Sequence, residues 1–586
     1  MIQIDYSRDS LLSEQGLELV RKHYLQNGEQ SPQDAFARTA ERYQSNPEHG
    51  QRIYDAVSNL HFMFASPVLS NSGKDARGLP ISCFLSYVPD TIQGLIDHED
   101  EAKWLSVYGG GVGGHWSDVR GPSDKAPGMI PFLHSVDGAM TAYRQGKTRK
   151  GAYAAYLDVS HPEVLEFTTV RVPGGDANRK SHNLHNAINI TDHFMDCVYK
   201  NLPWQLVDPK SRKVTNTVSA REVWEGILTT RHRTGEPYIN FIDAANDALH
   251  PAQKSLALAI RGSNLCNEIH LVTNAQRTAV CCLSSLNLET IDFWPATLVG
   301  DIIEMLDNVL TDFIERAPDT IHKARYAAMR SRDLGLGAMG WHGLLMQKSI
   351  AFESEEAEEL TDVIFARIKR QAQERSLYLA KTRGSCPDAV DTGYVARNLH
   401  LLAIAPNANS SIICNCTASI EPINSNAYPH RTRIGTHLVK NQYLERLLVT
   451  KAPVKTLEMM GMSVESWVKK QWTIVLQDEG SVQNLTCLTA HEKTVFKTFK
   501  ELDMHAVIRQ AGVRQRHLCQ GQSVNLYFAP VCAKPYFNSV HTLAHQLRLK
   551  GLYYIRTGSV AKADKLSTSV IREILGDAEE CVACQG

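Results

Sequence analysis

Apolar positions recur along this chain with two different periods. The stretch SPQDAFARTAERYQ at 31–44 has a serine cap, an early proline and apolar residues spaced by three and four, and residues 1 to about 60 follow this helical pattern. Between 150 and 345, short apolar stretches such as NAINI and EPYINFI alternate with longer helical patterns such as AREVWEGILTTRHR. This alternation predicts an α/β architecture with much parallel sheet.

Three other segments have distinct patterns. Residues 66–83 are rich in turn formers and end in a short apolar stretch, which predicts a loop entering a strand. Residues 354–383 predict one long amphipathic helix that stops at Gly384. Residues 430–515 are more charged and are predicted to be helical.

Composition limits the classes of protein. The 586 residues are 43% apolar and 21% charged, which is enough to bury a sizeable core. With 62 basic and 63 acidic residues, the net charge of -1 offers no general attraction to nucleic acid or membranes. The start has no signal-peptide core, and no apolar run could span a bilayer, so we expect a soluble cytoplasmic protein. The 13 scattered cysteines argue against a disulfide-stapled secreted fold.

The segment SNLCNEI at 263–269 spaces an amide, a thiol and a carboxylate by two residues: Asn264, Cys266 and Glu268. In an extended strand these side chains would point to one face, where the carboxylate could take a proton from a substrate hydroxyl and the amide could hold that substrate. The alternative is a strand with a buried cysteine and two polar neighbours, and from spacing alone this structural interpretation is favoured.

The chain ends in CVACQG, so Cys581 and Cys584 form a C-x-x-C pair in a polar tail. A zinc site would need two further ligands nearby, and the tail supplies none. A mobile dithiol that visits another site is the better interpretation.

Residues 401–416 predict an apolar strand, a polar turn and a helix whose first amides could bind phosphate around Ala408, Asn409, Ser410 and Ser411. An ordinary helix cap at Asn409 or Ser410 fits the pattern equally well. The glycine-rich stretch YGGGVGGHW at 108–116 lacks the lysine and hydroxyl of a P-loop and is a weak phosphate signal. Tyr553 and Tyr554 are adjacent in a strand-like run, which by itself predicts one core and one surface tyrosine.

Taken in order, these motifs resemble those of ribonucleotide reductase large subunits, from about Ser66 to Gly586. The matching stretches are SPVLSNSG…SC at 66–83, YGGGVGGHWSDVRG at 108–121, SNLCNEI at 263–269, AVCCLSSLNL at 279–288, LGLGAMGWHGLL at 334–345, PNANSS at 406–411, CQGQSVNLYF at 519–528, GLYYIRT at 551–557 and the terminal C-x-x-C. Chance could supply one or two of them, not all in this order.

The resemblance implies a role for each cysteine. Cys266 would become a thiyl radical that abstracts the ribose 3′ hydrogen, with Glu268 as the base for the 3′ hydroxyl and Asn264 binding the ribose. Cys83 and Cys281 would deliver two reducing equivalents and close to a disulfide as the 2′ hydroxyl leaves as water, although Cys282 is adjacent. Cys581 and Cys584 would re-reduce that pair and be restored by thioredoxin or glutaredoxin.

The tyrosine pair points to a class I enzyme. By resemblance, Tyr553 and Tyr554 would relay a radical from a metal-containing small (beta) subunit to Cys266. Adenosylcobalamin-dependent enzymes of class II do not need this relay, and the glycyl motif of class III is not found here. The resemblance thus implies no covalently bound cofactor and no metal in this chain, with the metal cofactor in the partner subunit.

The resemblance also implies where nucleotides bind. The substrate diphosphate would lie on residues 408–411, with Ser66 and Ser82 nearby. Asp90 and Arg149 would bind a deoxynucleotide or ATP as the allosteric specificity effector, at the interface of an expected homodimer. About 65 residues precede the first matched motif, which predicts a short form without the N-terminal ATP-cone and without overall inhibition by dATP, as in a streamlined bacterial or viral enzyme.

The fold expected from the resemblance is a ten-stranded α/β barrel of two antiparallel five-stranded halves with a central finger loop. We expect a helical segment at 1–65, the barrel at 66–564 and a mobile redox tail at 565–586. A catalytically silent nucleotide-binding homologue, or a lone dithiol oxidoreductase, is the competing hypothesis; it is weakened because each cysteine of the site is present.

Overall fold

The computed structural model describes residues 2–73, 78–143, 151–432 and 435–557. Arg149, Cys581, Cys584 and the predicted tail at 565–586 lie outside these residues.

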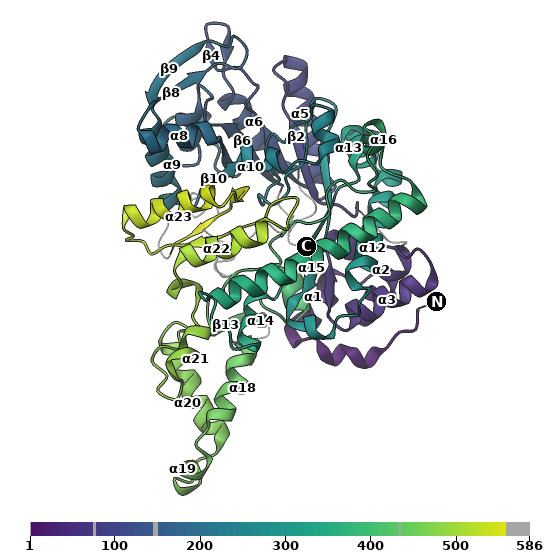
Figure 1. Ribbon diagram of the computed structural model, residues 1–586, viewed down its shortest axis with the longest axis vertical. Helices are drawn as coiled ribbons and strands as arrows, with labels where there is room; N and C mark the ends of the chain where they lie inside the picture. The colour runs from purple at the N-terminus through teal and green to yellow at the C-terminus, as the bar shows by residue number, and fades with distance from the viewer. Residues whose placement is uncertain (1, 74–77, 144–150, 433–434, 558–586) are drawn as a thin grey trace.

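The amino-terminal segment is helical, as predicted. A short 3₁₀ helix, η1 (Tyr6–Leu11), is followed by α1 (Glu14–His23), α2 (Pro32–Arg42) and α3 (Pro47–Ser58). Ser31 caps α2, because its hydroxyl and the carboxylate of Asp34 satisfy amides at the start of the helix. In Figure 1 these purple helices lie beside α12 and the long helix α15.

Five parallel strands form the first half of the sheet. They are β2 (Cys83–Tyr87), β3 (Gly111–His115), β6 (Ala152–Asp158), β7 (His185–Ile190) and β10 (Tyr238–Phe241). The helices between them are α5 (Ile92–Val107), α6 (Ile130–Ala142), α8 (Asp192–Lys200) and α9 (Ala220–Thr234). The alternating pattern thus gives the expected parallel sheet, because each crossover helix returns the chain in the same direction.

The second half closes the sheet into a ring. β11 (Ala279–Asn287) is antiparallel to β2 and parallel to β12 (Leu334–Met339), and β16 (Gly551–Leu552) is antiparallel to β10. Parallel bridges join Leu336 to Leu402 and Ile404 to Gln522, and β15 (Leu526–Tyr527) pairs with β17 (Ile555–Arg556). The second set of five is therefore β11, β12 and the segments 402–404, 522–527 and 551–556. The predicted ten-stranded barrel of two antiparallel halves is confirmed.

The loop at 261–270 lies inside the barrel, because it contacts strands of both halves. Tyr156 of β6 donates a hydrogen bond to the Asn264 carbonyl (2.6 Å), and Asn267 donates to the carbonyls of Ile239 (3.2 Å) and Leu552 (3.4 Å). A methyl group at Gly113 of β3 would lie 1.9 Å from the Ser263 carbonyl oxygen. The glycine-rich stretch therefore makes room for the central loop. This close approach explains the glycine at 113, which the sequence alone suggested only weakly as part of a phosphate site.

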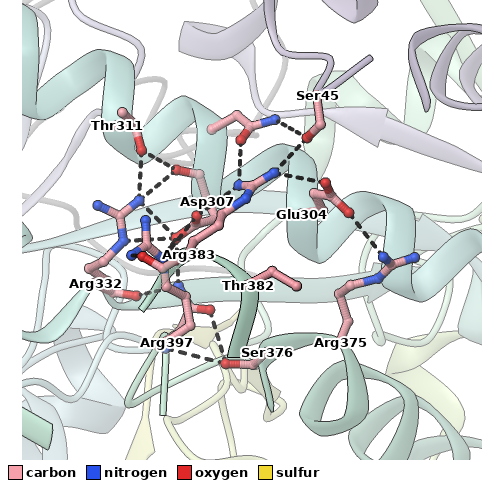
Figure 2. A network of polar contacts seen from close by, with 12 residues as sticks. Ser45, Glu304, Asp307, Thr311, Arg332, Arg375, Ser376, Thr382, Arg383 and Arg397 are labelled. Atoms are coloured by element: carbon pink, nitrogen blue, oxygen red, sulfur yellow. Dashed lines mark hydrogen bonds and ion pairs between the residues drawn. The ribbon is translucent and has the colours of Figure 1, made fainter. Parts of the chain in front are cut away.

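Helices on the outside are joined by a buried network of charges (Figure 2). Asp307 of α12 (Leu298–Arg316) is fully buried and accepts hydrogen bonds from Arg332 (2.8 Å), Arg383 (3.1 Å) and Arg397 (3.2 Å). Arg383 is the last residue of α15 (Glu355–Arg383), which begins after the Ser354 cap and ends before Gly384, as predicted. The network fixes the end of α15 and the chain at 397–398 to α12.

A helical arm extends from the barrel at the bottom of Figure 1. It contains α18 (Gln442–Lys451), α19 (Val454–Met459), α20 (Val464–Gln477) and α21 (Ala490–Val495), with a core of its own around Leu444, Leu448 and Trp472. The hairpin of β13 (Ala427–Thr432) and β14 (Gly435–Lys440) at its base was not predicted. None of the helices in the described part of the chain is long and apolar enough to cross a bilayer.

Two helices complete the barrel's surroundings, α22 (Met504–Gln515) and α23 (Lys534–Gln546). The loop predicted for 66–83 is only partly correct, because residues 66–71 form a short helix, α4 (Ser66–Asn71), with Pro67 in its first turn. A proline is well tolerated there, since that amide has no helical partner. The apolar end of the segment does enter a strand, β2, at Cys83.

Candidate active site

Cys83 and Cys281 lie directly opposite each other where the two halves of the barrel meet. Cys83 is the first residue of β2, and the antiparallel register pairs its Cα with that of Cys281 on β11. Both side chains are buried. Directly opposed residues of an antiparallel pair have Cα atoms about 4.5–5.5 Å apart, which is within the range of a disulfide. The two cysteines can therefore form and break a bond without moving the strands.

Cys282 occupies a different position from its neighbour. Its register partner is Leu334 on β12, whereas Cys281 faces Cys83. Because successive side chains of a strand point to opposite faces, only one of the adjacent cysteines can share a face with Cys83. The strand geometry therefore selects Cys281 as the partner of Cys83.

Cys266 lies in the central loop, fully buried, together with Asn264 and Glu268. The Asn264 side chain donates to a Glu268 carboxylate oxygen (3.0 Å), and its own oxygen accepts from the Glu268 amide (3.1 Å). The prediction of an extended segment is wrong, because residues 265–267 form a turn in which Asn267 has a φ of 59°. The turn, rather than strand alternation, brings the amide and the carboxylate together.

The segment 520–523 connects the paired cysteines with the central loop. Gln520 donates to the Cys281 sulfur (3.5 Å) and to the Leu334 carbonyl (2.8 Å). The Gly521 amide donates to the Glu268 carbonyl (2.8 Å). The Ser523 hydroxyl contacts the Cys266 carbonyl (2.7 Å) and the Glu268 carboxylate (3.1 Å). These residues were in a matched stretch of the sequence, but nothing in the pattern gave them a role.

Burial controls the protonation of the adjacent Cys281 and Cys282 thiols. Desolvation raises the pKa of Cys281 well above its usual value, and only the hydrogen bond from Gln520 opposes this effect appreciably. Desolvation raises the pKa of Cys282 as well. Cys281 is therefore a protonated thiol at neutral pH, which can donate a hydrogen as well as electrons.

Of the residues predicted to hold phosphate, Ser66 lies on α4, residues 408–411 lie on α17 (Ala408–Ile413), and Ser82 directly precedes β2. The Tyr24 hydroxyl is 2.7 Å from the Ser66 hydroxyl and accepts from the Asn409 amide (3.5 Å), so it links the two helices. Ser410 and Ser411 are buried in α17, whose first residue is Ala408. The cap residue is Asn407, without a side-chain cap hydrogen bond, so the alternative of a cap by Asn409 or Ser410 is wrong. Tyr24 had no signal in the sequence.

A small pocket joins this region to the thiols. Ser82 and Cys281 line this pocket. The rest of its lining is apolar and consists of Ala65, Pro67, Pro80, Ile81 and Leu283. A group bound beside Ser82 would therefore lie next to a reducing thiol.

Tyr553 and Tyr554 lie between β16 and β17 and pack against each other. Their ring centroids are 4.2 Å apart, and the ring of Tyr238 lies 4.9 Å from Tyr553 and 5.1 Å from Tyr554. Tyr553 is buried and Tyr554 is partly exposed. The expectation of one core and one surface tyrosine is thus met in exposure, but the two rings form one cluster. Asn267 of the central loop donates to the carbonyl of Leu552, which directly precedes Tyr553, so this cluster lies next to the central loop.

A histidine held by a carboxylate contacts the outer tyrosine. The Tyr554 hydroxyl is 3.2 Å from His185 Nδ1 and 3.4 Å from Nε2, and Glu236 accepts from Nδ1 at 2.7 Å. Burial opposes the ionisation of Glu236, but the charge of Arg171 and the hydrogen bonds that Glu236 accepts from His185 and Arg171 outweigh it and lower its pKa to about 2. His185 and Glu236 were not predicted. The available signal was a polar residue at or just before the start of each of two neighbouring strands, β7 and β10.

Asp90, predicted to bind the effector, lies between β2 and α5. Its carboxylate forms an ion pair with Arg120, whose Nε is 2.9 Å from both carboxylate oxygens. Within the described residues, no group of three or more His, Cys, Asp and Glu side chains is arranged to hold a metal ion.

The α/β barrel buries Cys266 in its central loop and Cys83 and Cys281 at the junction of its two halves, an arrangement suited to thiol redox chemistry. Two family models match the chain: "Ribonucleotide reductase, barrel domain" at residues 81–395 and 389–555, and "Ribonucleotide reductase, all-alpha domain" at residues 10–77. The chain therefore belongs to the ribonucleotide reductase large-subunit family.

Individual relatives agree with this assignment. The chain is 51% identical over 556 residues to the putative ribonucleoside-diphosphate reductase large subunit of Frog virus 3, covering 94% of this chain and 95% of that protein. It is 38% identical to the ribonucleoside-diphosphate reductase large subunit of Invertebrate iridescent virus 3, over the full length of both. The solved class Id ribonucleotide reductase alpha subunit of Actinobacillus ureae superposes with a TM-score of 0.82 at 30% identity, covering 96% of this chain and 99% of that chain.

Proposed function

We propose that this chain is the catalytic subunit of a class I ribonucleoside-diphosphate reductase, which converts ribonucleotides to 2′-deoxyribonucleotides in the cytoplasm. The observation that carries the proposal is that Cys83 and Cys281 are cross-strand partners beside a buried loop that bears Cys266. Gln520 contacts Cys281, and the adjacent Gly521 contacts the loop at Glu268. Two thiols supply the electrons of one reduction, and a third, shielded thiol is available for radical chemistry.

The proposed reaction assigns a role to each of the five residues. The Cys266 thiyl radical takes the 3′ hydrogen, and Glu268 accepts the proton of the 3′ hydroxyl while Asn264 holds the ribose. The 2′ hydroxyl then leaves as water, with protons and electrons from Cys83 and Cys281, which close to a disulfide. Glu268 gives its proton back to the 3′ oxygen and Cys266 returns the 3′ hydrogen, so the carboxylate and the thiyl radical are both regenerated. One ribonucleotide and two thiols thus give one deoxyribonucleotide, one water and one disulfide.

Radical delivery is assigned to the tyrosine cluster. A metal-containing small subunit would supply the oxidising equivalent, which passes through Tyr554 and Tyr553 to Cys266. Burial raises the pKa of Tyr554 well above its usual value, so the neutral phenol must release a proton when it is oxidised. With Nδ1–H bound to Glu236, the free Nε2 of His185 can accept that proton from Tyr554 at 3.4 Å.

Nucleotide binding is proposed from the arrangement around α4 and α17. The diphosphate would contact Ser66, Ser82 and residues 408–411, because this region opens beside Cys281. Asp90 and Arg149 would bind a deoxynucleotide or ATP effector in a homodimer. The dithiol of Cys581 and Cys584 would re-reduce the Cys83–Cys281 disulfide and be served by thioredoxin or glutaredoxin.

A single-turnover assay tests the proposal. The fully reduced chain, mixed with CDP and a metal-containing small subunit, should form dCDP, and Cys266→Ser should abolish it. Cys487→Ser is the matched control, because Cys487 lies in the helical arm and contacts Gln471 rather than the site. A chain that binds CDP but forms no dCDP would be a silent homologue. Turnover that needs only adenosylcobalamin would overturn the class I assignment.

A further inference from the structure

A second pocket, of about 180 Å³, lies apart from the residues assigned above. It is bounded by the chain after α10 (Ile242–Asp247), by Lys369 and Gln373 of α15, and by the segments 399–402 and 517–519. None of the predicted catalytic or substrate-binding residues lines it. Nothing in the proposed reaction uses this pocket, yet its lining contains several groups that can bind a ligand.

His400 is the most informative of these groups. Its side chain is 1% exposed, and its Nδ1 is 2.8 Å from a carboxylate oxygen of Asp333. Its Nε2 is buried and has no hydrogen-bond partner among the described residues. An unpartnered polar atom in the interior is unfavourable, so a group that hydrogen-bonds to Nε2 would stabilise the site. With Nδ1–H directed at Asp333, the neutral ring offers Nε2 as an acceptor.

Other groups on the wall are donors. His250 Nδ1 accepts from the Ala252 amide (3.2 Å), so in the neutral ring the proton is on Nε2. Lys369 uses one of its three donors on the Arg516 carbonyl (3.2 Å), and His517 Nε2 is 2.8 Å from Asp362. No aspartate or glutamate lines the pocket within the described residues. A negatively charged ligand would therefore meet donors without facing a carboxylate.

The chemistry of the ligand follows from this combination. Lys369 and His250 require acceptor oxygens, and His400 Nε2 requires a protic group. A hydrogen phosphate group has both, and so does a carboxylate with a neighbouring hydroxyl. The remaining wall is apolar, which leaves room for a small hydrocarbon part; it consists of Ala248, Leu249, Pro251, Leu399, Leu401 and Leu402.

The pocket is connected to the reducing thiol through Cys519. The Cys519 sulfur accepts hydrogen bonds from the amides of Leu401 (3.0 Å) and Leu402 (3.1 Å), all three residues being part of the wall. The next residue, Gln520, donates to Cys281 (3.5 Å). Lys550 donates to the carbonyls of both Cys519 and Gln520, the latter at 3.0 Å, and so holds the segment rigid.

We propose that this pocket is a second ligand site, for a small molecule bearing a protic oxyanion, and that its occupancy is transmitted to Cys281 through Cys519 and Gln520. The binding part stands independently, while the consequence for catalysis rests on the proposed reductase function. A ligand that displaces Leu401 or Leu402 would move the Cys519 sulfur and thereby alter the hydrogen bond from Gln520 to Cys281.

Equilibrium dialysis of the full chain tests binding, with radiolabelled inorganic phosphate and L-lactate as the two probes. Saturating CDP and deoxynucleotide occupy the nucleotide sites during the measurement. We expect one equivalent of at least one probe to bind, and which probe binds distinguishes a phosphate from a hydroxycarboxylate. Lys369→Gln and His250→Ala should each weaken binding about tenfold, as for the loss of one charged hydrogen bond. Lys470→Gln, at an exposed position of α20, is the matched control. If neither probe binds, or if the two pocket variants bind as the wild type does, the site is refuted.

Alkylation of Cys281 tests the coupling. The rate at which iodoacetamide modifies Cys281, followed by peptide mass spectrometry, should change about fivefold on saturation with the bound probe. The change should be lost in Cys519→Ala, which removes the sulfur contacts to Leu401 and Leu402. A probe that binds while the Cys281 rate stays constant would overturn the coupling. Neither result depends on dCDP formation, so failure here is distinguishable from failure of the reductase proposal.

Discussion

Cys83 and Cys281 are direct cross-strand partners at the junction where β2 of one half of the barrel pairs with β11 of the other. They are far apart in sequence, and the antiparallel junction is what brings them together. Their position also means that disulfide formation would link the two halves covalently. The oxidation state of this pair therefore determines whether the two halves of the barrel are covalently linked.

The register predicts which of the two adjacent cysteines is oxidised. After one turnover of the reduced chain carrying Cys581→Ser and Cys584→Ser, so that the tail cannot re-reduce the pair, peptide mass spectrometry should find a disulfide between Cys83 and Cys281. Cys281→Ser should prevent both this disulfide and dCDP formation, because Cys282 faces Leu334 on the other side of the strand. Cys282→Ser is the matched control and should retain both. A disulfide from Cys83 to Cys282 would contradict the register.

Much of the fold could be predicted because local patterns dominate it. The alternation of NAINI and AREVWEGILTTRHR identifies β7 and α9, and the end of α15 follows from Gly384. The hairpin at 427–440 was missed, because that region carries a helical, charged composition overall. The barrel itself came from the resemblance, since strand periodicity does not specify closure.

The site was predictable in its residues but not in its geometry. The motifs named Asn264 and Glu268, but they meet across a turn, which a period of two could not indicate. Tyr24 and His185 were missed because each acts through a contact with a residue remote in sequence, Ser66 and Tyr554. Such contacts depend on the tertiary packing of the barrel, for which a single sequence has no local signal.

The contact between His185 and Tyr554 predicts a role in radical transfer. His185→Gln should slow dCDP formation by roughly 100-fold or more, as for the loss of a general base. CDP binding and the thermal midpoint should stay close to those of the wild type. His193→Gln, at an exposed position on α8, is the control and should keep full activity. A His185→Gln enzyme with wild-type rate would remove His185 from the pathway.

Glu236 predicts a pH-dependent contribution to stability. Its pKa is lowered from 4.5 to about 2, so the folded state favours the ionised carboxylate, and this contribution is present above pH 4.5 and lost as the pH falls toward 2. For this buried group the shift corresponds to about 3 kcal/mol of unfolding free energy at pH 7. Urea unfolding of Glu236→Gln and wild type should differ by that order at pH 7, and by less at pH 4. A difference that grows on acidification would contradict this sign.

Asp307 predicts the largest effect on stability away from the site. Its carboxylate is fully buried among Arg332, Arg383 and Arg397, so Asp307→Asn would leave Arg332 and Arg397 without their ion-pair partner and Arg383 with Glu304 alone (Figure 2). Removing one partner of a buried ion pair typically costs about 3–5 kcal/mol, because the remaining charges stay desolvated.

The expected result is a thermal midpoint that falls by several degrees, measured by scanning calorimetry on the full chain. Asp196→Asn provides the control. Asp196 is 61% exposed, and the change removes only its contact with Lys200, at a distance of 4.0 Å. That change should alter the free energy by less than about 0.5 kcal/mol. Because the network fixes α15, whose Lys369 and Gln373 line the second pocket, Asp307→Asn should also weaken phosphate binding there. Equal midpoints for the two variants would mean that the arginines find water or other partners, and that the network does not hold α15 in place.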